Sequence, residues 1–123
     1  MMTGSITSER EAVLSLSIRN SDGVEVTVQA LVDTGYNGTL TLPQAIIDTL
    51  ALPWHGARLV TLADGSTVEL GIYRAHVLWH DEERAVQSLA ADGGPLLGMA
   101  LLYGSRLTMD ILDGSAFTIA PLV

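Results

Sequence analysis

The sequence contains four Asp-Gly pairs, and these pairs constrain its fold more than any other feature. Asp-Gly suits the two central residues of a tight turn between antiparallel strands, because those positions require positive φ angles. Three pairs lie between segments with alternating polar and apolar residues or many β-branched residues, at 22–23, 64–65 and 113–114. The remaining pair, at 92–93, is not flanked in this way. The sequence therefore predicts three β-hairpins.

The segments beside these turns supply the expected strands. In VEVTVQALV, residues 24–32, alternation holds until the end, where both faces become apolar, so this strand runs into the core. One short helix is expected between Pro43 and Pro53, and a single helical turn is expected before Gly104. We predict strands at 12–19, 24–32, 39–42, 58–63, 66–80, 84–91, 95–97, 106–112 and 115–123, with a polar turn at 81–84. These elements predict a mostly-β closed or partly open barrel with one or two short helices.

Length and composition are those of one compact domain. The chain has 123 residues, of which 48% are hydrophobic and 16% are charged. Such a chain can bury a sizeable core, and its composition is not that of a disordered segment. We expect a single domain over residues 1–123, with a core from about residue 11 to residue 120.

The charge balance argues against two classes of partner. Six basic and fourteen acidic side chains give a net charge of -8, which opposes binding to nucleic acids and to anionic membranes. The longest nearly apolar stretch, residues 93–104, is too short and too rich in glycine to cross a bilayer. The first ten residues lack the pattern of a signal peptide, so we expect a cytoplasmic protein.

The chain has no cysteine, so its chemistry must use oxygen or imidazole groups. His76 and His80 have the spacing of metal ligands on a helix, but their segment is predicted to be a strand, where this spacing places both on one face. No glutamate of a His-Glu-x-x-His motif accompanies them, and His55 is expected in a surface loop. We predict neither a metal site nor a cofactor.

Asp33 directly follows the apolar run Ala30-Leu31-Val32. A carboxylate at the end of a buried strand is costly unless it accepts hydrogen bonds or shares a proton. Gly35 allows the backbone to turn back so that its amide reaches this carboxylate, and Thr34 carries a hydroxyl for a neighbouring strand or subunit. The alternative to a catalytic role is that Asp33 only begins a turn after the strand, which is a common structural use of aspartate. For catalysis on an amide one carboxylate is insufficient, because one group must accept a proton and another must supply one.

Asp33-Thr34-Gly35, the strand TLTL after it, a hairpin about thirty residues on, and Leu96-Leu97-Gly98 before a short helix together resemble the retroviral-type aspartic proteases. The likeness is strongest to the small single-domain members from bacteria and archaea. This resemblance implies a retropepsin-like barrel and a homodimeric endopeptidase that cuts peptide or protein substrates. It also implies that Asp33 from each copy forms a catalytic pair that shares one proton and activates a water, with no metal or covalent intermediate.

The same resemblance assigns roles to the residues around Asp33. Thr34 corresponds to a residue that bonds across the dimer axis, and Gly35 to one whose carbonyl meets the substrate backbone. It also implies that Tyr36, Asn37 and Gly38 bind the substrate. The flap that closes over a bound peptide would consist of Ala63, Asp64, Gly65 and Ser66. Packing beneath the catalytic loop would come from Leu96, Leu97 and Gly98.

Three positions depart from the family pattern. Tyr36, Asn37 and Met99 stand where retroviral enzymes usually have Ala, Asp and Arg, and the last two of those residues form an ion pair. Both charges are missing together, so no buried charge is left without a partner. These departures motivate a second hypothesis, in which the protein is a catalytically inactive protease-fold module used for peptide binding or dimerisation. A shared sheet of chain ends, as in retroviral dimers, would use residues 117–123, where Pro121 limits pairing.

Overall fold

The fold is mostly β, as the sequence predicts. A computed structural model describes residues 1–123 and contains ten strands and two short helices. Their bounds are β1 (Met2–Ile6), β2 (Ala12–Arg19), β3 (Glu25–Val32), β4 (Leu40–Leu42), α1 (Gln44–Thr49), β5 (Trp54–Thr61), β6 (Thr67–Trp79), β7 (Glu82–Ala90), β8 (Leu96–Leu97), α2 (Met99–Leu102), β9 (Ser105–Met109) and β10 (Ala116–Pro121). Neither helix has the length and apolar character that crossing a membrane requires.

The three predicted hairpins are present. β2 pairs with β3, β5 with β6, and β9 with β10, each pair antiparallel. Gly23, Gly65 and Gly114 in the connecting turns have φ angles of 82°, 85° and 81°. Residues with a Cβ atom rarely adopt this region, so the glycine of each Asp-Gly pair permits the turn. Local chemistry thus determines three of the strand pairings.

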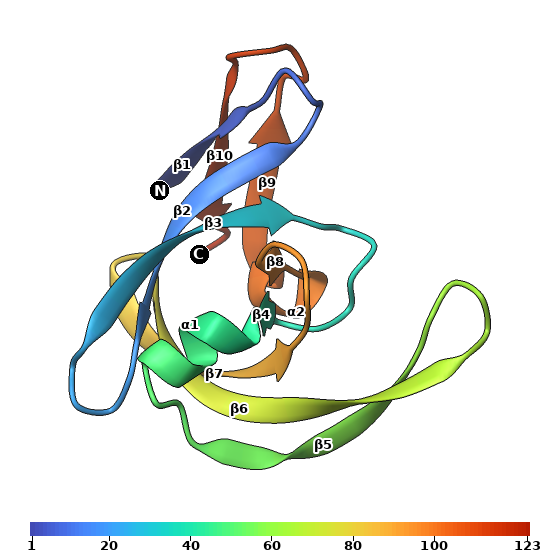
Figure 1. The fold of residues 1–123 in the computed structure, drawn as a ribbon. Coiled ribbons are helices and arrows are strands. Elements are labelled where there is room, and N and C mark those ends of the chain that lie inside the picture. Colours follow the sequence, from blue (N-terminus) through green and yellow to red (C-terminus); the bar gives the residue numbers. More distant parts are fainter.

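All ten strands belong to one sheet, and part of that sheet closes on itself. The strand order is β5-β6-β7-β4-β8-β3-β2-β1-β10-β9, and β6 makes an additional pairing with β2. This pairing closes β2, β3, β8, β4, β7 and β6 into a ring, with β5 added on one side and β1, β10 and β9 on the other (Figure 1). The architecture is therefore a closed six-stranded ring with strands added at both edges.

The hydrophobic core comes from side chains that alternate along the strands. On β2, Leu14, Leu16 and Ile18 are buried, while Ser15 between them is exposed. The predicted entry of residues 24–32 into the core is confirmed, because Val28 and Ala30 of β3 are buried. Twenty buried hydrophobic residues from strands and both helices form one contiguous cluster. A single core of this kind is what one domain needs.

Residues 2–6 form a strand that the sequence pattern did not predict. β1 lies between β2 and β10, with Ser5 opposite Val13 and Met2 opposite Ile119. Ile6 is buried, so the core begins before residue 11, the limit that we expected. β10 consequently has neighbours on both edges, β1 and β9, within one copy of the chain. Neither edge of β10 is free to join a sheet shared between chain ends.

Three predicted boundaries are wrong by a few residues. The turn between β6 and β7 consists of His80 and Asp81, with φ angles of 51° and 64°, and residues 82–84 belong to β7. His55 is exposed on β5, beside a bulge in the pairing with β6, and not in a loop. β9 ends at Met109, before the turn to β10. In each case the pairing between strands, which alternation alone does not reveal, decides where the strand ends.

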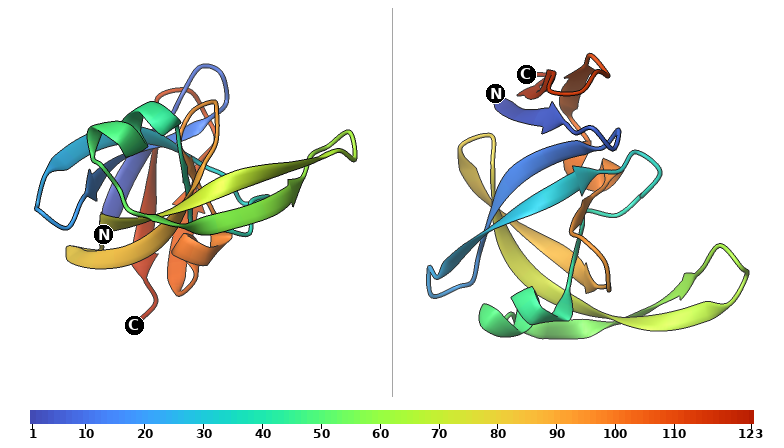
Figure 2. Two further views of the ribbon diagram at one scale, coloured as in Figure 1. Left: turned by 60° about the horizontal axis from the view of Figure 1, so that its bottom comes forward. Right: turned by 45° about the horizontal axis from the view of Figure 1, so that its top comes forward.

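The hairpin of β5 and β6 extends beyond the closed ring. Residues 67–71 of β6 pair only with β5, whereas the later residues pair with β7 and β2. Figure 2 shows that this hairpin reaches out on the same side of the molecule as the loop between β3 and β4. β6 thus belongs both to the closed ring and to the projecting part of the β5–β6 hairpin.

Candidate active-site loop and groove

Asp33 begins the loop between β3 and β4, residues 33–39, which we call the Asp33 loop. Its side chain is half-buried, and its carboxylate oxygen Oδ1 accepts a hydrogen bond of 2.9 Å from the Gly35 N–H. The Asp33 carbonyl accepts a second bond, of 3.2 Å, from the Tyr36 N–H. The predicted turn of the backbone at Gly35 toward the carboxylate is therefore present. Thr34 beside it is exposed.

The Asp33 loop is held from below by β8 and the residues that follow it. β8 lies between β3 and β4, parallel to the first and antiparallel to the second. The Asp33 N–H donates to the Leu97 carbonyl at 2.9 Å, and the Gly98 N–H donates to the Thr39 carbonyl at 3.0 Å. The Met99 N–H donates to the carbonyl of Tyr36 at 2.8 Å. These bonds fix both ends and the middle of the loop, because backbone groups that are buried must find partners.

Gly98 approaches this loop too closely to carry a side chain. A Cβ atom at this position would lie 2.2 Å from the Gly38 carbonyl oxygen and 2.8 Å from the Tyr36 carbonyl oxygen. Both are backbone atoms, so neither can move without displacing the loop. Leu97 beside it is fully buried in the core, and Leu96 is half-buried. The apolar pair and the glycine therefore lie beneath the loop that Asp33 begins.

Tyr36 is half-buried and folds back onto the loop that carries it. Its ring lies against two glycines, since a Cβ on Gly38 would be 2.3 Å from the Tyr36 hydroxyl oxygen and one on Gly98 would be 2.6 Å from Tyr36 Cδ2. Burial raises the pKa of the Tyr36 hydroxyl, and the positive charge of Arg58 opposes that rise. The tyrosine thus fills space beside the loop that a smaller residue would leave open.

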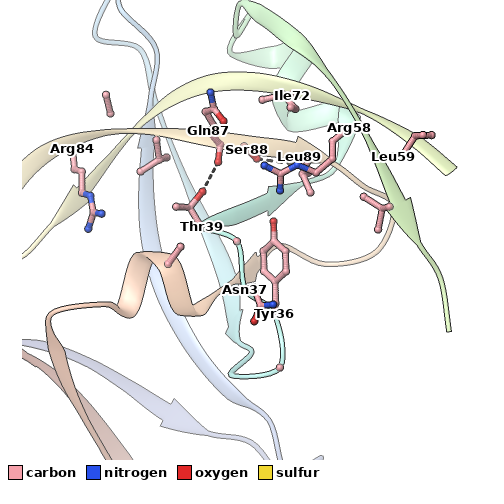
Figure 3. Close-up of a pocket in the computed structure, with 16 residues that line it drawn as sticks. Tyr36, Asn37, Thr39, Arg58, Leu59, Ile72, Arg84, Gln87, Ser88 and Leu89 are labelled. Carbon is pink, nitrogen blue, oxygen red and sulfur yellow. Dashed lines mark hydrogen bonds between the residues drawn. The ribbon is translucent and has the colours of Figure 1, made fainter. Parts of the chain in front are cut away.

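A groove of about 680 Å³ lies between the Asp33 loop and the β5–β6 hairpin (Figure 3). The loop contributes residues 35–39, β5 contributes 58–60, and β7 contributes 84–89. Tyr36, Asn37 and Gly38, the predicted substrate-binding residues, all line it. The β5 and β7 residues were not predicted, because only their pairing with opposite edges of β6 brings them to the same groove.

Asp33 lines a second hollow, of about 350 Å³, together with Thr34. Most of its walls are apolar and come from β1, β3, β8 and β9, with Ile6, Leu31, Val32, Leu96, Leu107 and Met109 among them. Ile111 also lines the hollow, and the next residue, Leu112, is exposed beside it, with exposed fractions of 67% and 70%. Asp33 thus lines this hollow, which Arg10 and Glu11 also line, whereas the groove is lined by the loop residues from Gly35 onward.

The predicted flap residues, Ala63 to Ser66, form the tip of the β5–β6 hairpin. Asp64 accepts hydrogen bonds from the Ser66 hydroxyl and, at 2.9 Å, from the Ser66 N–H, and these bonds lower the pKa of the Asp64 carboxyl. All four tip residues are exposed, and none lines the groove. The part of the hairpin that lines it is residues 58–60 on one strand and Ile72 on the other. The tip thus stands away from Asp33 in this structure.

The histidines lie apart from the Asp33 loop. His76 Nδ1 is 3.6 Å from a carboxylate oxygen of Glu83, and His80 Nε2 is 2.8 Å from the Ser105 hydroxyl oxygen. No three His, Asp or Glu side chains come together in an arrangement able to hold a metal ion. The two histidines therefore have separate partners, one across the β6–β7 hairpin and one on β9.

Comparisons of this chain with protein-family models, with curated proteins and with solved structures gave no match.

Replacing Gly98 with Ala tests how closely β8 supports the loop. The new methyl group overlaps two backbone carbonyls, so we expect the free energy of unfolding to fall by about 1–3 kcal/mol. Urea unfolding of the wild type and the variant measures this loss. Gly94→Ala is the matched control, because nothing lies within 4 Å of a Cβ there. Equal unfolding midpoints for Gly98→Ala and the wild type would contradict the close contact.

Proposed function

We propose that this protein is a homodimeric aspartic endopeptidase of the retroviral type, with Asp33 of each copy forming the catalytic pair. The observation that carries the proposal is the geometry around Asp33. A carboxylate at the end of β3 accepts the Gly35 N–H, on a loop fixed by β8 and pressed against Gly98. The fold that the proposal assigns is a retropepsin-like barrel. Its support is the insertion of β8 between β3 and β4 within a closed ring.

A second carboxylate has to come from another copy of the chain. Glu11 is the one other acidic side chain that lines the hollow of Asp33, and no hydrogen bond joins the two carboxyl groups; the Asp33 carboxylate accepts only the Gly35 N–H. Two Asp33 carboxylates facing each other across a twofold axis cannot both ionise, so they hold one proton between them. The charged one then takes a proton from a bound water, and the neutral one donates to the carbonyl of the scissile peptide bond.

The apolar surface beside Asp33 supports association of two copies on this side. Its hollow is mostly apolar, and Ile111 and Leu112 next to it are largely exposed. Covering this surface with a second copy removes apolar side chains from water and brings the two Asp33 loops together. Thr34 is exposed at the same place, where its hydroxyl is available to a partner. Chain ends are a poorer route to a dimer, because both edges of β10 are occupied.

The groove beside the Asp33 loop supports a peptide as the substrate. It has about 680 Å³, it reaches Gly35, and one of its walls is the projecting β5–β6 hairpin. An extended peptide between the loop and the hairpin would present its backbone to Gly35 and lie near Asp33. Movement of the hairpin would bring its tip over the peptide and exclude water, as lids do in many enzymes.

Tyr36 favours the second candidate, a module that binds peptides or forms dimers without hydrolysis. Its half-buried ring occupies the loop side of the groove, which limits how near a peptide comes to Asp33. Asn37 and Met99, at the positions of the missing ion pair, are both exposed. Both candidate functions assume the same fold, and they differ in whether the protein cuts a peptide bond.

Replacing Asp33 with Asn separates the two candidates. The amide cannot take a proton from water, so we expect cleavage of a peptide library at mildly acidic pH to fall by at least about 1,000-fold. The fold and the dimer should remain, as measured by circular dichroism and sedimentation. Asp22→Asn, in the β2–β3 turn, is the matched control and should cleave like the wild type. Undiminished cleavage by Asp33→Asn would refute the mechanism, and no cleavage by the wild type would favour the binding module.

Replacing Ile111 with Asp tests the proposed dimer surface. A charge in an apolar interface loses its hydration, so we expect the dimer dissociation constant to rise by at least about tenfold, with a parallel loss of activity at low protein concentration. Analytical ultracentrifugation over a range of concentrations measures this change. Val24→Asp provides a control, because Val24 is also exposed but lies near the β2–β3 turn. If Ile111→Asp associates like the wild type, two copies do not meet on this surface.

A further inference from the structure

The groove beside the Asp33 loop has a charge opposite to that of the whole chain. Fourteen acidic and six basic side chains give the protein a net charge of -8, and all six basic residues are arginines. Two of these six, Arg58 and Arg84, line the groove, and no Asp or Glu lines it. The charged side chains that line this cavity are therefore all basic, although acidic side chains outnumber basic ones more than twofold in the whole chain.

Neither groove arginine has an acidic partner within the protein. The ion pairs in the structure are Arg19 with Glu25 and His76 with Glu83, both away from the groove. Arg58 and Arg84 are exposed, so their guanidinium groups are available to a bound molecule. A guanidinium presents a planar set of N–H donors that matches the two oxygens of a carboxylate. The ligand group that best fits each arginine is thus a carboxylate.

The two arginines lie on the two strands that flank β6, at different positions along it. Arg58 on β5 is opposite Leu70 of β6, and Arg84 on β7 is opposite Val77 of β6. Leu70 and Val77 are seven steps apart in the chain, which corresponds to at most about 23 Å along β6. Figure 3 shows Arg58 near Leu89 and Arg84 on the far side of Thr39 and Gln87. An extended peptide with two acidic side chains several residues apart matches this spacing along β6.

The groove surface between the arginines is uncharged. Its side chains are apolar, as in Val86 and Leu89, or neutral and polar, as in Gln87 and Ser88. The negative field of the whole protein repels an acidic peptide at long range, but salt screens that repulsion beyond about 8 Å at physiological ionic strength. A carboxylate in direct contact with a guanidinium lies well within this screening length, so the attraction between them persists. At such salt concentrations the local charge, and not the net charge, decides which peptide is held.

We propose that this groove selects extended peptides that carry a Glu or Asp on each side of an apolar segment, with Arg58 and Arg84 as the specificity-determining residues. This inference rests on the proposed function only for its readout by cleavage, because the selection concerns binding as well. Arg58 and Arg84 contact the flanking acidic side chains, and the apolar segment lies between them, next to Gly35.

The test compares three synthetic peptides that differ only at two positions about six residues apart, which carry Glu, Gln or Lys around the same apolar centre. At pH 6.5 the glutamates are ionised. We expect the wild type to cleave the Glu peptide with a kcat/KM about tenfold above that of the Gln peptide, with the Lys peptide lowest. The preference should vanish in the double variant Arg58→Gln/Arg84→Gln and reverse toward Lys in Arg58→Glu/Arg84→Glu. Arg106→Gln, an exposed arginine of β9 outside the groove, should keep it.

Binding of the same peptides to the Asp33→Asn variant, measured by fluorescence anisotropy, separates the two proposals. Tighter binding of the Glu peptide, without cleavage of any peptide by the wild type, would support the groove selectivity and count against the endopeptidase. Equal cleavage or equal binding of all three peptides would overturn the selectivity, even if proteolysis is real. Absence of both binding and cleavage would also overturn it.

Discussion

Gly98 and the backbone of the Asp33 loop approach each other so closely that the rest of the site depends on this contact. Because β8 lies between β3 and β4, the loop joining those two strands must pass around the chain that follows β8. The hydrogen bonds of Leu97, Gly98 and Met99 then fix the loop from inside. The carboxylate of Asp33, the exposed Thr34 and the groove wall at Tyr36 all take their positions from this crossing.

The sequence predicted the parts of this fold that depend on local chemistry. The Asp-Gly turns, the turn at Gly35 and the stop of β3 at Asp33 follow from residues close together in the chain. β1 was missed because its main partner, β10, is more than a hundred residues away, and five residues carry too little alternation. The arginines of the groove were missed for the same reason, since only the register of β6 brings Arg58 and Arg84 to one cavity.

The predicted flap shows the limit of reading a role from position. The hairpin that the sequence predicts is present, but its tip residues, 63–66, are exposed and outside the groove. The residues that line the groove are nearer the base of the hairpin, where it joins the ring. β6 carries both parts, since residues 67–71 pair only with β5 and the later residues pair with β7 and β2.

The pairing of β10 with both β1 and β9 has a consequence for how activity would be controlled. Within one copy, β10 has a partner on each edge and the buried hydrophobic residues form one cluster. A protein whose copies fold alone and meet only at the surface beside Asp33 would switch on as its concentration rises, with turnover growing as the square of the amount made while the single copy predominates. The amount of protein in the cell would then itself be the regulator.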